Sequence, residues 1–172
     1  ADADEELPRG GDACSYTPQN AEGPFYRDDA PVRSDIRPPD SSGVILTLRG
    51  SVTTADCQPI EGALVDFWQA DDEGHYDNDG SLPDVDPDDF RFRGVQLTNA
   101  EGAYELVTIL PGRYLNGDNF RPRHIHVKVS SPLSPTVLTT QLYFPDDECL
   151  EFDGLVDERL LVTVPVSYTH LT

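Results

Sequence analysis

The chain has 172 residues, which is the size of one domain or of one domain with a tail. It carries 32 Asp and Glu against 12 Lys and Arg, so its formal net charge is −20. Such a surface suits nucleic acid poorly, because phosphate contacts need clustered cations, and no apolar run approaches the ~18 residues of a membrane span. Hydrophobic residues make up 37% of the chain, which is enough for a folded core.

Residues 1–43 are rich in Pro, Gly and Asp without a sustained hydrophobic period, so we expect an extended N-terminal arm that lies on the domain. From residue 44 onward, apolar and polar residues alternate as they do in half-buried strands. The strands predicted from this alternation are 44–52, 63–68, 103–109, 123–130, 137–144 and 159–166. Turns rich in Gly, Pro, Asn and Asp separate them. Residues 167–172 then form a C-terminal tail.

Many short strands without a helical period predict an all-β domain over residues 44–166, a mostly antiparallel β-sandwich and not a parallel α/β sheet. An acidic segment at 77–92 offers carboxylates for calcium, but the twelve-residue calcium-loop pattern fails because no Glu stands at its closing position. We expect a solvated loop there.

The segment 121–129 reads Arg-Pro-Arg-His-Ile-His-Val-Lys-Val. Alternate residues of a strand share a face, so Ile125 and Val127 are expected to face the core, with His124 and His126 on the other side. Two imidazoles so spaced lie roughly 6.5–7 Å apart along a strand, close enough to converge on one ion. Two histidines on a solvated sheet face remain the alternative, because the motif is short.

Two tyrosines favour the metal hypothesis. Tyr76 follows Gly-His, and Tyr114 follows Pro-Gly-Arg ten residues before His124. Taken singly, each has an ordinary interpretation, Tyr76 as a turn aromatic and Tyr114 as a strand-start residue that covers one end of a sandwich.

The combination resembles the intradiol ring-cleavage dioxygenases, the family of catechol and protocatechuate 3,4-dioxygenases. The resemblance covers roughly residues 23–166, with a signature through 48–76, a Pro-Gly-x-Tyr segment and an Arg-Pro-x-His-x-His segment. Cys57 departs from the usual Gly or Ser, and Arg123 from the common Ala. The resemblance implies one non-haem Fe(III) per chain. Its protein ligands would be Tyr76, Tyr114, His124 and His126.

The same resemblance implies cleavage of a catechol between its two hydroxylated carbons, with both atoms of O2 entering a cis,cis-muconate-type product. It assigns Arg121 to stabilising negative charge on the ring, Gln141 to lining the substrate pocket, and Tyr114 to leaving the metal when substrate binds. A phenolate suits Fe(III), since a bound cation displaces the phenolic proton despite an ordinary pKa near 10. From the residues alone, the Arg121 stem could instead cover the sheet, and Gln141 could be an exposed amide.

A different class stays open. The glycine and proline spacing also resembles carboxypeptidase-regulatory-like sandwiches, which are often non-catalytic extracellular modules, and fold does not separate the two. His124 and His126 together with Tyr76 favour the enzyme, because a spacer has no need for them. Arg113, Arg121 and Arg123 form a local cluster of positive charge. Either this cluster attracts an anionic catechol, or it is paired with the acidic loop.

Cys14 and the segment 16–26 look like the exported branch of the family, so we predict a secreted protein. We expect a Cys57–Cys149 disulfide, because both residues lie in polar turns near strand ends, with Cys14 left over. The chain has no segment long enough for the helical dimerisation domain of larger catechol dioxygenases. A monomer or small homo-oligomer is therefore expected, with a small catechol and O2 as partners.

Overall fold

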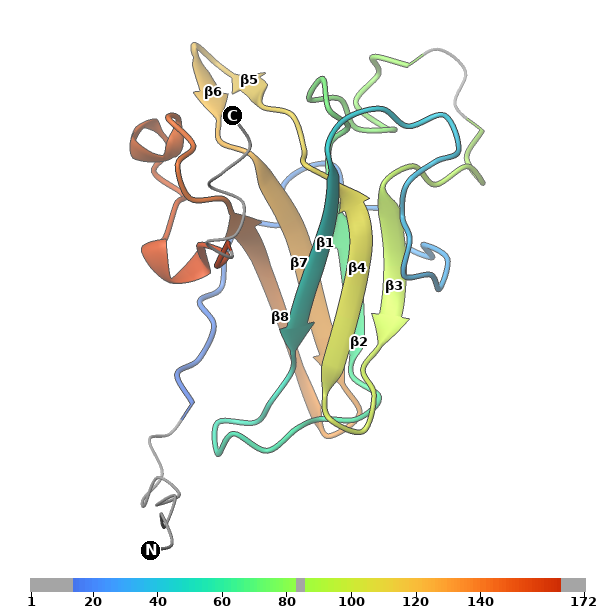
Figure 1. Cartoon of the computed structure of the whole chain (residues 1–172), viewed down its shortest axis with the longest axis vertical. Coiled ribbons are helices and arrows are strands. Elements are labelled where there is room, and N and C mark those ends of the chain that lie inside the picture. The colour runs from blue at the N-terminus through green and yellow to red at the C-terminus, as the bar shows by residue number, and fades with distance from the viewer. Residues whose placement is uncertain (1–13, 83–85, 165–172) are drawn as a thin grey trace, which may run out of the picture.

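The computed structural model describes residues 14–82 and 86–164, which form an almost entirely β structure (Figure 1). Their elements are β1 (Ile45–Ser51), β2 (Leu64–Trp68), β3 (Arg93–Leu97), β4 (Ala103–Ile109), β5 (Tyr114–Asn116), β6 (Asn119–Arg121), β7 (His124–Ser131), β8 (Ser134–Tyr143) and the 3₁₀ helices η1 (Leu150–Phe152) and η2 (Glu158–Leu160). All pairings between named strands are antiparallel. Among the residues described, no helix combines the length and apolar character that crossing a membrane requires.

The strands form two layers (Figure 1). A four-stranded sheet of order β3-β2-β7-β8 packs on the β1-β4 pair, and the β5-β6 hairpin stands at one end. The core between the layers includes Phe67 from β2 and Ile125 and Val127 from β7, so the inward orientation predicted for β7 is confirmed. His124 and His126 alternate with these residues and lie on the outer face of the four-stranded sheet. The predicted antiparallel β-sandwich is confirmed.

The register of the sheet brings polar and aromatic residues to one level of that outer face. His126 on β7 is paired with Trp68 on β2 and with Gln141 on β8. His124 is paired with Tyr143 in the same way. Directly opposite residues of an antiparallel pair share a face, so these side chains form one continuous group at the end of the sheet where β7 begins.

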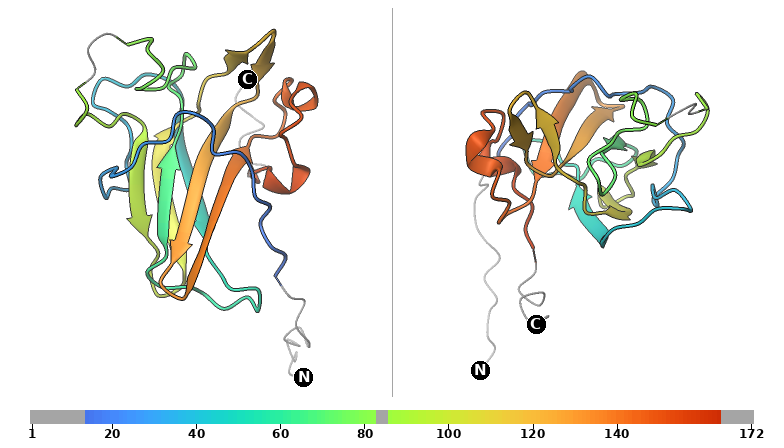
Figure 2. Two further views of the ribbon diagram at one scale, coloured as in Figure 1. Left: turned by 180° about the vertical axis from the view of Figure 1, so that it is seen from behind. Right: turned by 90° about the horizontal axis from the view of Figure 1, so that it is seen from above.

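The described part of the arm crosses the outer face and covers this group (Figure 2). The Asn20 amide donates to a β8 carbonyl at 2.8 Å, and the Tyr26 hydroxyl donates to the Asp66 carboxylate of β2 at 3.0 Å. Farther along, Val32 bridges to β3. The arm therefore makes an interior out of a sheet face that solvent would otherwise reach.

The strand predicted at 159–166 is wrong for the described residues. Glu158–Leu160 is a 3₁₀ turn, and only Leu161 bridges to the end of β8. The Asp157 carboxylate accepts a hydrogen bond from the Arg159 amide and starts the turn, which offers the backbone an alternative to the sheet ladder. The predicted tail at 167–172 lies outside the described residues.

The predicted Cys57–Cys149 disulfide is also wrong. Cys57 bonds to Cys14 with the two Cα atoms 5.3 Å apart, whereas Cys149 is a free thiol next to η1. Cys57 lies in the turn region after β1, while Cys149 lies at the opposite end of the sandwich, beside the start of β7, where Asp147 accepts a hydrogen bond from the Arg123 amide. The bond fastens the arm to the sandwich.

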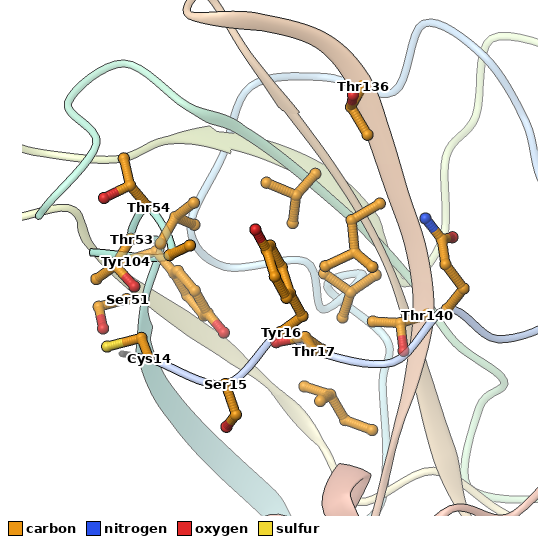
Figure 3. A pocket seen from close by; sticks show the side chains of 17 residues that line it. Cys14, Ser15, Tyr16, Thr17, Ser51, Thr53, Thr54, Tyr104, Thr136 and Thr140 are labelled. Atoms are coloured by element: carbon orange, nitrogen blue, oxygen red, sulfur yellow. The ribbon is translucent and has the colours of Figure 1, made fainter. Parts of the chain in front are cut away.

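A hollow of about 420 Å³ opens between the sheets at the disulfide end (Figure 3). Apolar side chains of both sheets line it together with Ser and Thr hydroxyls, and Tyr16 and Tyr104 also border it (Figure 3). Gly50 faces Tyr104, and any side chain there would collide with the phenol. None of the described residues that line it has a charged side chain.

Candidate metal centre

The two histidines of β7 are buried and oriented by the sheet. His124 is 2% exposed and His126 is 1% exposed. His124 Nδ1 lies 2.7 Å from the carbonyl oxygen of Pro122. A carbonyl only accepts, so Nδ1 carries the proton and Nε2 keeps its lone pair for a metal. Burial and, second, the Arg121 guanidinium lower the pKa of His124 to about 4, so the ring is neutral at pH 7.

His126 is positioned by stacking. The Trp68 indole lies parallel to its ring, with centroids 4.8 Å apart and an angle of 5° between the planes. Tyr26 of the arm packs edge-on against the Trp68 ring, at 4.9 Å between centroids. Gly23 passes close to the His126 ring with a positive φ of 72°. The arm and β2 together hold this imidazole on the outer face of β7.

Tyr76 lies in the loop after β2, and a close backbone approach brings it to Tyr114. The Gly112 amide donates to the Asp71 carbonyl at 2.7 Å. Gly74 has a φ of +91°, and a Cβ there would collide with the Arg113 carbonyl just before β5. Glycine therefore lets the two tyrosine-bearing segments meet. The centroids of the two phenol rings are 5.7 Å apart.

The four side chains present their polar atoms to one point. The Tyr76 hydroxyl lies 3.1 Å from His126 Nε2, and the Tyr114 hydroxyl lies 3.4 Å from His124 Nε2. Two donor atoms that each bind one ion at about 2.0–2.2 Å and about a right angle are about 3 Å apart. The spacing between these donors therefore fits a single bound cation.

The donor chemistry fits a ferric ion. Burial and, second, the neighbouring Tyr114 raise the pKa of Tyr76 well above its ordinary value, so without a cation the phenol stays protonated. A bound cation has the opposite effect on the pKa of Tyr76, because it stabilises the phenolate. Among the residues the structure describes, no cluster of three or more His, Cys, Asp and Glu side chains could hold a metal. The site therefore depends on its tyrosines.

Arg121 lies beside the four donors. Its Nη1 is 3.4 Å from the Tyr114 hydroxyl and 3.4 Å from His124 Nε2. On its other side, Nε donates to the Asp153 carboxylate at 2.7 Å. The guanidinium is buried and permanently charged, so it places a fixed positive charge at the edge of the site.

Gln141 lies behind Arg121. Its Oε1 accepts from Arg121 Nη2 at 2.9 Å and from the Tyr143 hydroxyl at 2.9 Å, and its Nε2 donates to the Ala21 carbonyl of the arm at 2.7 Å. The side chain is fully buried, so the alternative of an exposed amide is wrong. Its contact with a substrate stays a prediction, since here its polar atoms hold Arg121 and the arm.

The guanidiniums near the site are paired with a segment that the sequence did not indicate. Arg113 pairs with Asp147 at 3.0 Å and with Glu148 at 2.8 Å, and Arg123 lies 3.6 Å from Asp147. Of the two alternatives, pairing of these arginines with the acidic loop is not found among the loop residues that the structure describes. In that loop, Asp77 instead pairs with Arg27 and Arg93, each at 2.7 Å.

Phe25 is a site residue that sequence reasoning missed. Its ring stacks on Tyr76 at 4.4 Å between centroids and meets Tyr114 edge-on at 6.2 Å. The aromatic pair Phe25-Tyr26 in an otherwise polar arm was the available signal. For Asp153, the partner of Arg121, no local pattern distinguishes it from other acidic loop residues.

A second hollow, of about 360 Å³, opens next to the two tyrosines. Tyr76 and Tyr114 form part of its wall together with Phe25, Leu115 and Phe120. A small aromatic molecule fits a space of this size. It would lie directly against the phenol groups.

Comparison with known proteins agrees with this geometry. A family model described as "Dioxygenase" matches residues 21–166. The chain is 33% identical over 173 residues to catechol 1,2-dioxygenase 1 of Acinetobacter lwoffii, an alignment that covers 88% of this chain and 53% of that protein. It spans about half the length of the curated relatives it matches.

Two solved structures share the fold. The dioxygenase domain of a dioxygenase carbohydrate-binding protein fusion from Streptomyces sp. SirexAA-E is 43% identical, with a TM-score of 0.76 over 88% of this chain and 89% of that one. The 3-chlorocatechol 1,2-dioxygenase of Rhodococcus opacus 1CP is 29% identical, with a TM-score of 0.75 over 87% of this chain and 67% of that one. On these matches, the chain belongs to the intradiol ring-cleavage dioxygenase family.

Proposed function

We propose that this chain is an Fe(III)-dependent intradiol dioxygenase that binds one iron per chain and cleaves catechols between their hydroxylated carbons with O2. The observation that carries the proposal is the convergence of two neutral imidazoles and two phenols. These are Tyr76, Tyr114, His124 and His126. Bound iron would supply the Lewis acidity that makes a catechol acidic and its ring reactive toward O2.

Tyr114 is suited to receive a proton from the catechol. It is half-buried and lines the hollow, whereas Tyr76 is fully buried. The contacts of the Tyr114 hydroxyl with His124 and with Arg121 are long, at 3.4 Å each, so it can move without breaking a short hydrogen bond to either residue. A phenolate that turns away from the other donors can accept the substrate proton at its oxygen.

Arg121 would stabilise negative charge that develops on the ring. Asp153 and Gln141 hold the guanidinium in place before substrate arrives. A charge that is already oriented in a buried site needs no reorganisation during the reaction, which makes its stabilisation effective. The arm covers the histidines and keeps bulk water from that side.

The alternative of a non-catalytic sandwich module has no support from the site. Tyr76, His124 and His126 are buried polar groups, and among the four donors only the 3.1 Å contact between Tyr76 and His126 has an ordinary hydrogen-bond length. Burying polar groups with so few hydrogen bonds among them costs stability. A spacer gains nothing from this arrangement, whereas a metal centre needs it. The names of the relatives above also favour the enzyme.

We further propose that the protein is secreted and is a monomer or small homo-oligomer. The Cys14–Cys57 disulfide supports an oxidising compartment. Quantifying free thiols without reductant tests the first point, since the proposal expects only Cys149 to react. Light scattering of the purified protein tests the second.

Iron content, colour and oxygen uptake test the enzymatic proposal together. The iron-loaded protein should be wine-red from phenolate-to-iron charge transfer, contain about one iron per chain and consume O2 with catechol. Tyr104→Phe is a matched control, because this phenol lies in the hollow at the far end of the sandwich, and it should leave the colour unchanged. Iron-loaded protein that is colourless and consumes no O2 would contradict the proposal.

A further inference from the structure

The wall of the hollow beside the tyrosines is apolar where it meets solvent. Leu115 and Phe120 are paired across the β5-β6 hairpin, so their side chains share one face. Leu115 is 60% exposed and Phe120 is 51% exposed. With Phe25 on the arm, they border the hollow that contacts both phenols. A substituent on a bound ring would have apolar surface available to cover.

The positive charges near this hollow are already neutralised. Arg121 is paired with Asp153, and Arg113 with Asp147 and Glu148. Each guanidinium is therefore in direct contact with at least one carboxylate. A substrate carboxylate would have to compete with these partners to gain a positive charge.

The hollow adds negative charge of its own. Glu73 and Asp79 line it, and the Glu73 side chain is 78% exposed. Arg113 lines it too, but its guanidinium is paired with Asp147 and Glu148. Asp79 is fixed there, because its carboxylate accepts from the Tyr76 amide at 2.8 Å. An anionic substituent would approach these carboxylates and lose hydration without an unpaired cation to replace it.

The hollow at the other end of the sandwich does not offer a competing substrate site. It is larger, at about 420 Å³ (Figure 3), but none of the four converging donors lines it. Selectivity among catechols therefore rests on the walls beside Tyr76 and Tyr114.

We infer that this site selects uncharged catechols with an apolar ring substituent over catechols that bear a carboxylate, an inference that rests on the proposed function. The selecting residues are Leu115 and Phe120, through apolar contact, and Glu73, through repulsion.

The test uses the iron-loaded full chain with 4-ethylcatechol and protocatechuate, the 4-carboxylate analogue. Dissociation constants come from the change in the visible band without O2, and kcat/KM comes from O2 uptake. 4-Ethylcatechol should be favoured at least about tenfold in both, because two apolar carbons gain contact and no carboxylate loses water.

Three variants identify the cause. Phe120→Ser should lower the ratio of kcat/KM for 4-ethylcatechol to that for catechol by about fivefold. Glu73→Gln should raise kcat/KM for protocatechuate severalfold by removing the repulsion. Glu101→Gln, an exposed acid in the turn before β4 at the opposite end, makes the same change in net charge and should leave both substrates unaffected.

The outcomes separate the two proposals. Turnover of protocatechuate at or above the rate for 4-ethylcatechol would overturn the selectivity and leave the dioxygenase intact. An equal gain from Glu101→Gln would also overturn it, because overall charge and not the wall would then be responsible. No spectral change and no O2 uptake with any catechol would overturn the proposed function and this inference together.

Discussion

The histidine half and the tyrosine half of the candidate metal centre are built differently. His124 and His126 come from β7, an inner strand of the four-stranded sheet, with pairing partners on both sides. Tyr76 comes from a loop and Tyr114 from the start of a short hairpin. A strand within a sheet holds its side chains more rigidly than a hairpin that projects from it. The difference indicates which donors stay in place and which can exchange.

The contacts also distinguish the two tyrosines from each other, although they are the same residue type. Tyr76 is buried and stacked against Phe25 at 4.4 Å, and its amide is hydrogen-bonded to Asp79. Tyr114 borders the hollow, and its hydroxyl contacts with His124 and Arg121 are long, at 3.4 Å each. We therefore propose that Tyr76 belongs with the histidines as a fixed donor and that Tyr114 is the donor that exchanges.

The largest effect should follow removal of a histidine. His124→Ala or His126→Ala should lower iron affinity by more than about 100-fold, since loss of groups that merely support a ligand already costs 10–100-fold. Metal analysis after dialysis measures the effect. His75→Asn is the matched control, because its Nδ1 lies 3.8 Å from the Asp71 carboxylate and 3.9 Å from the Glu73 carboxylate and it is not one of the four proposed donors. If both alanine variants retained one iron per chain, the assignment of His124 and His126 as iron ligands would be contradicted.

The two tyrosines should then behave unequally. Tyr76→Phe should lower iron affinity and weaken the visible band, because a fixed anionic donor is lost. Tyr114→Phe should keep iron but lower kcat by about 10²–10⁴, the usual contribution of a positioned proton acceptor. Metal content and O2 uptake separate these effects. Full activity in Tyr114→Phe would show that no exchange of this residue is needed.

A change behind the histidines should have a smaller effect. Trp68→Leu removes the ring that stacks on His126 and should lower iron affinity about tenfold and stability by about 3 kcal/mol. Trp68→Phe retains an aromatic face and should recover most of the iron affinity. Calorimetric iron titration and thermal unfolding measure the two quantities. If Phe and Leu weakened iron binding equally, stacking would not position His126.

The histidines and the tyrosines also differ in how far the sequence predicts them. The orientation of His124 and His126 came from strand alternation alone, because alternation is a local property of the sequence. Their burial could not be predicted in this way, since it depends on the arm. Tyr76 and Tyr114 were assigned only through the family resemblance, because loop geometry brings them together and no periodicity reports it.

The missed elements have separate causes. β3 was not predicted because Gly94 interrupts its pattern, and a side chain there would collide with Ile36 of the arm. The β5 and β6 strands have three residues each, too few for alternation to be visible. The Cys14–Cys57 pairing depends on the path of the arm, which composition does not specify. β3 and the disulfide thus depend on tertiary contacts, whereas β5 and β6 are too short for their pattern to be read.

The smallest predicted effect concerns Asp66, beside the histidine half. Burial raises the pKa of Asp66 to about 6 in the folded protein, although Tyr26 donates to the carboxylate. Since the unfolded value is near 3.9, ionisation opposes folding above pH 6, and this penalty disappears below about pH 4. Asp66→Asn should therefore be more stable than the parent by about 1 kcal/mol at pH 7, after allowance for solvent screening, with no advantage at pH 4.

Denaturant unfolding at the two pH values measures this effect. An advantage of the Asn variant that grew as the pH fell would contradict the assigned direction of the shift. An advantage of the same size at both pH values would mean that the substitution acts through packing.

Resonance Raman spectroscopy, with excitation in the visible band of the iron-loaded protein, tests most directly whether both tyrosines bind one ferric ion. Enhanced tyrosinate ring vibrations are expected in the parent, with a reduced set in Tyr114→Phe and a different reduced set in Tyr76→Phe. Tyr104→Phe should match the parent. If the parent showed no enhanced tyrosinate vibrations, or if neither site substitution changed them, Tyr76 and Tyr114 would not be iron ligands and the proposed centre would be wrong.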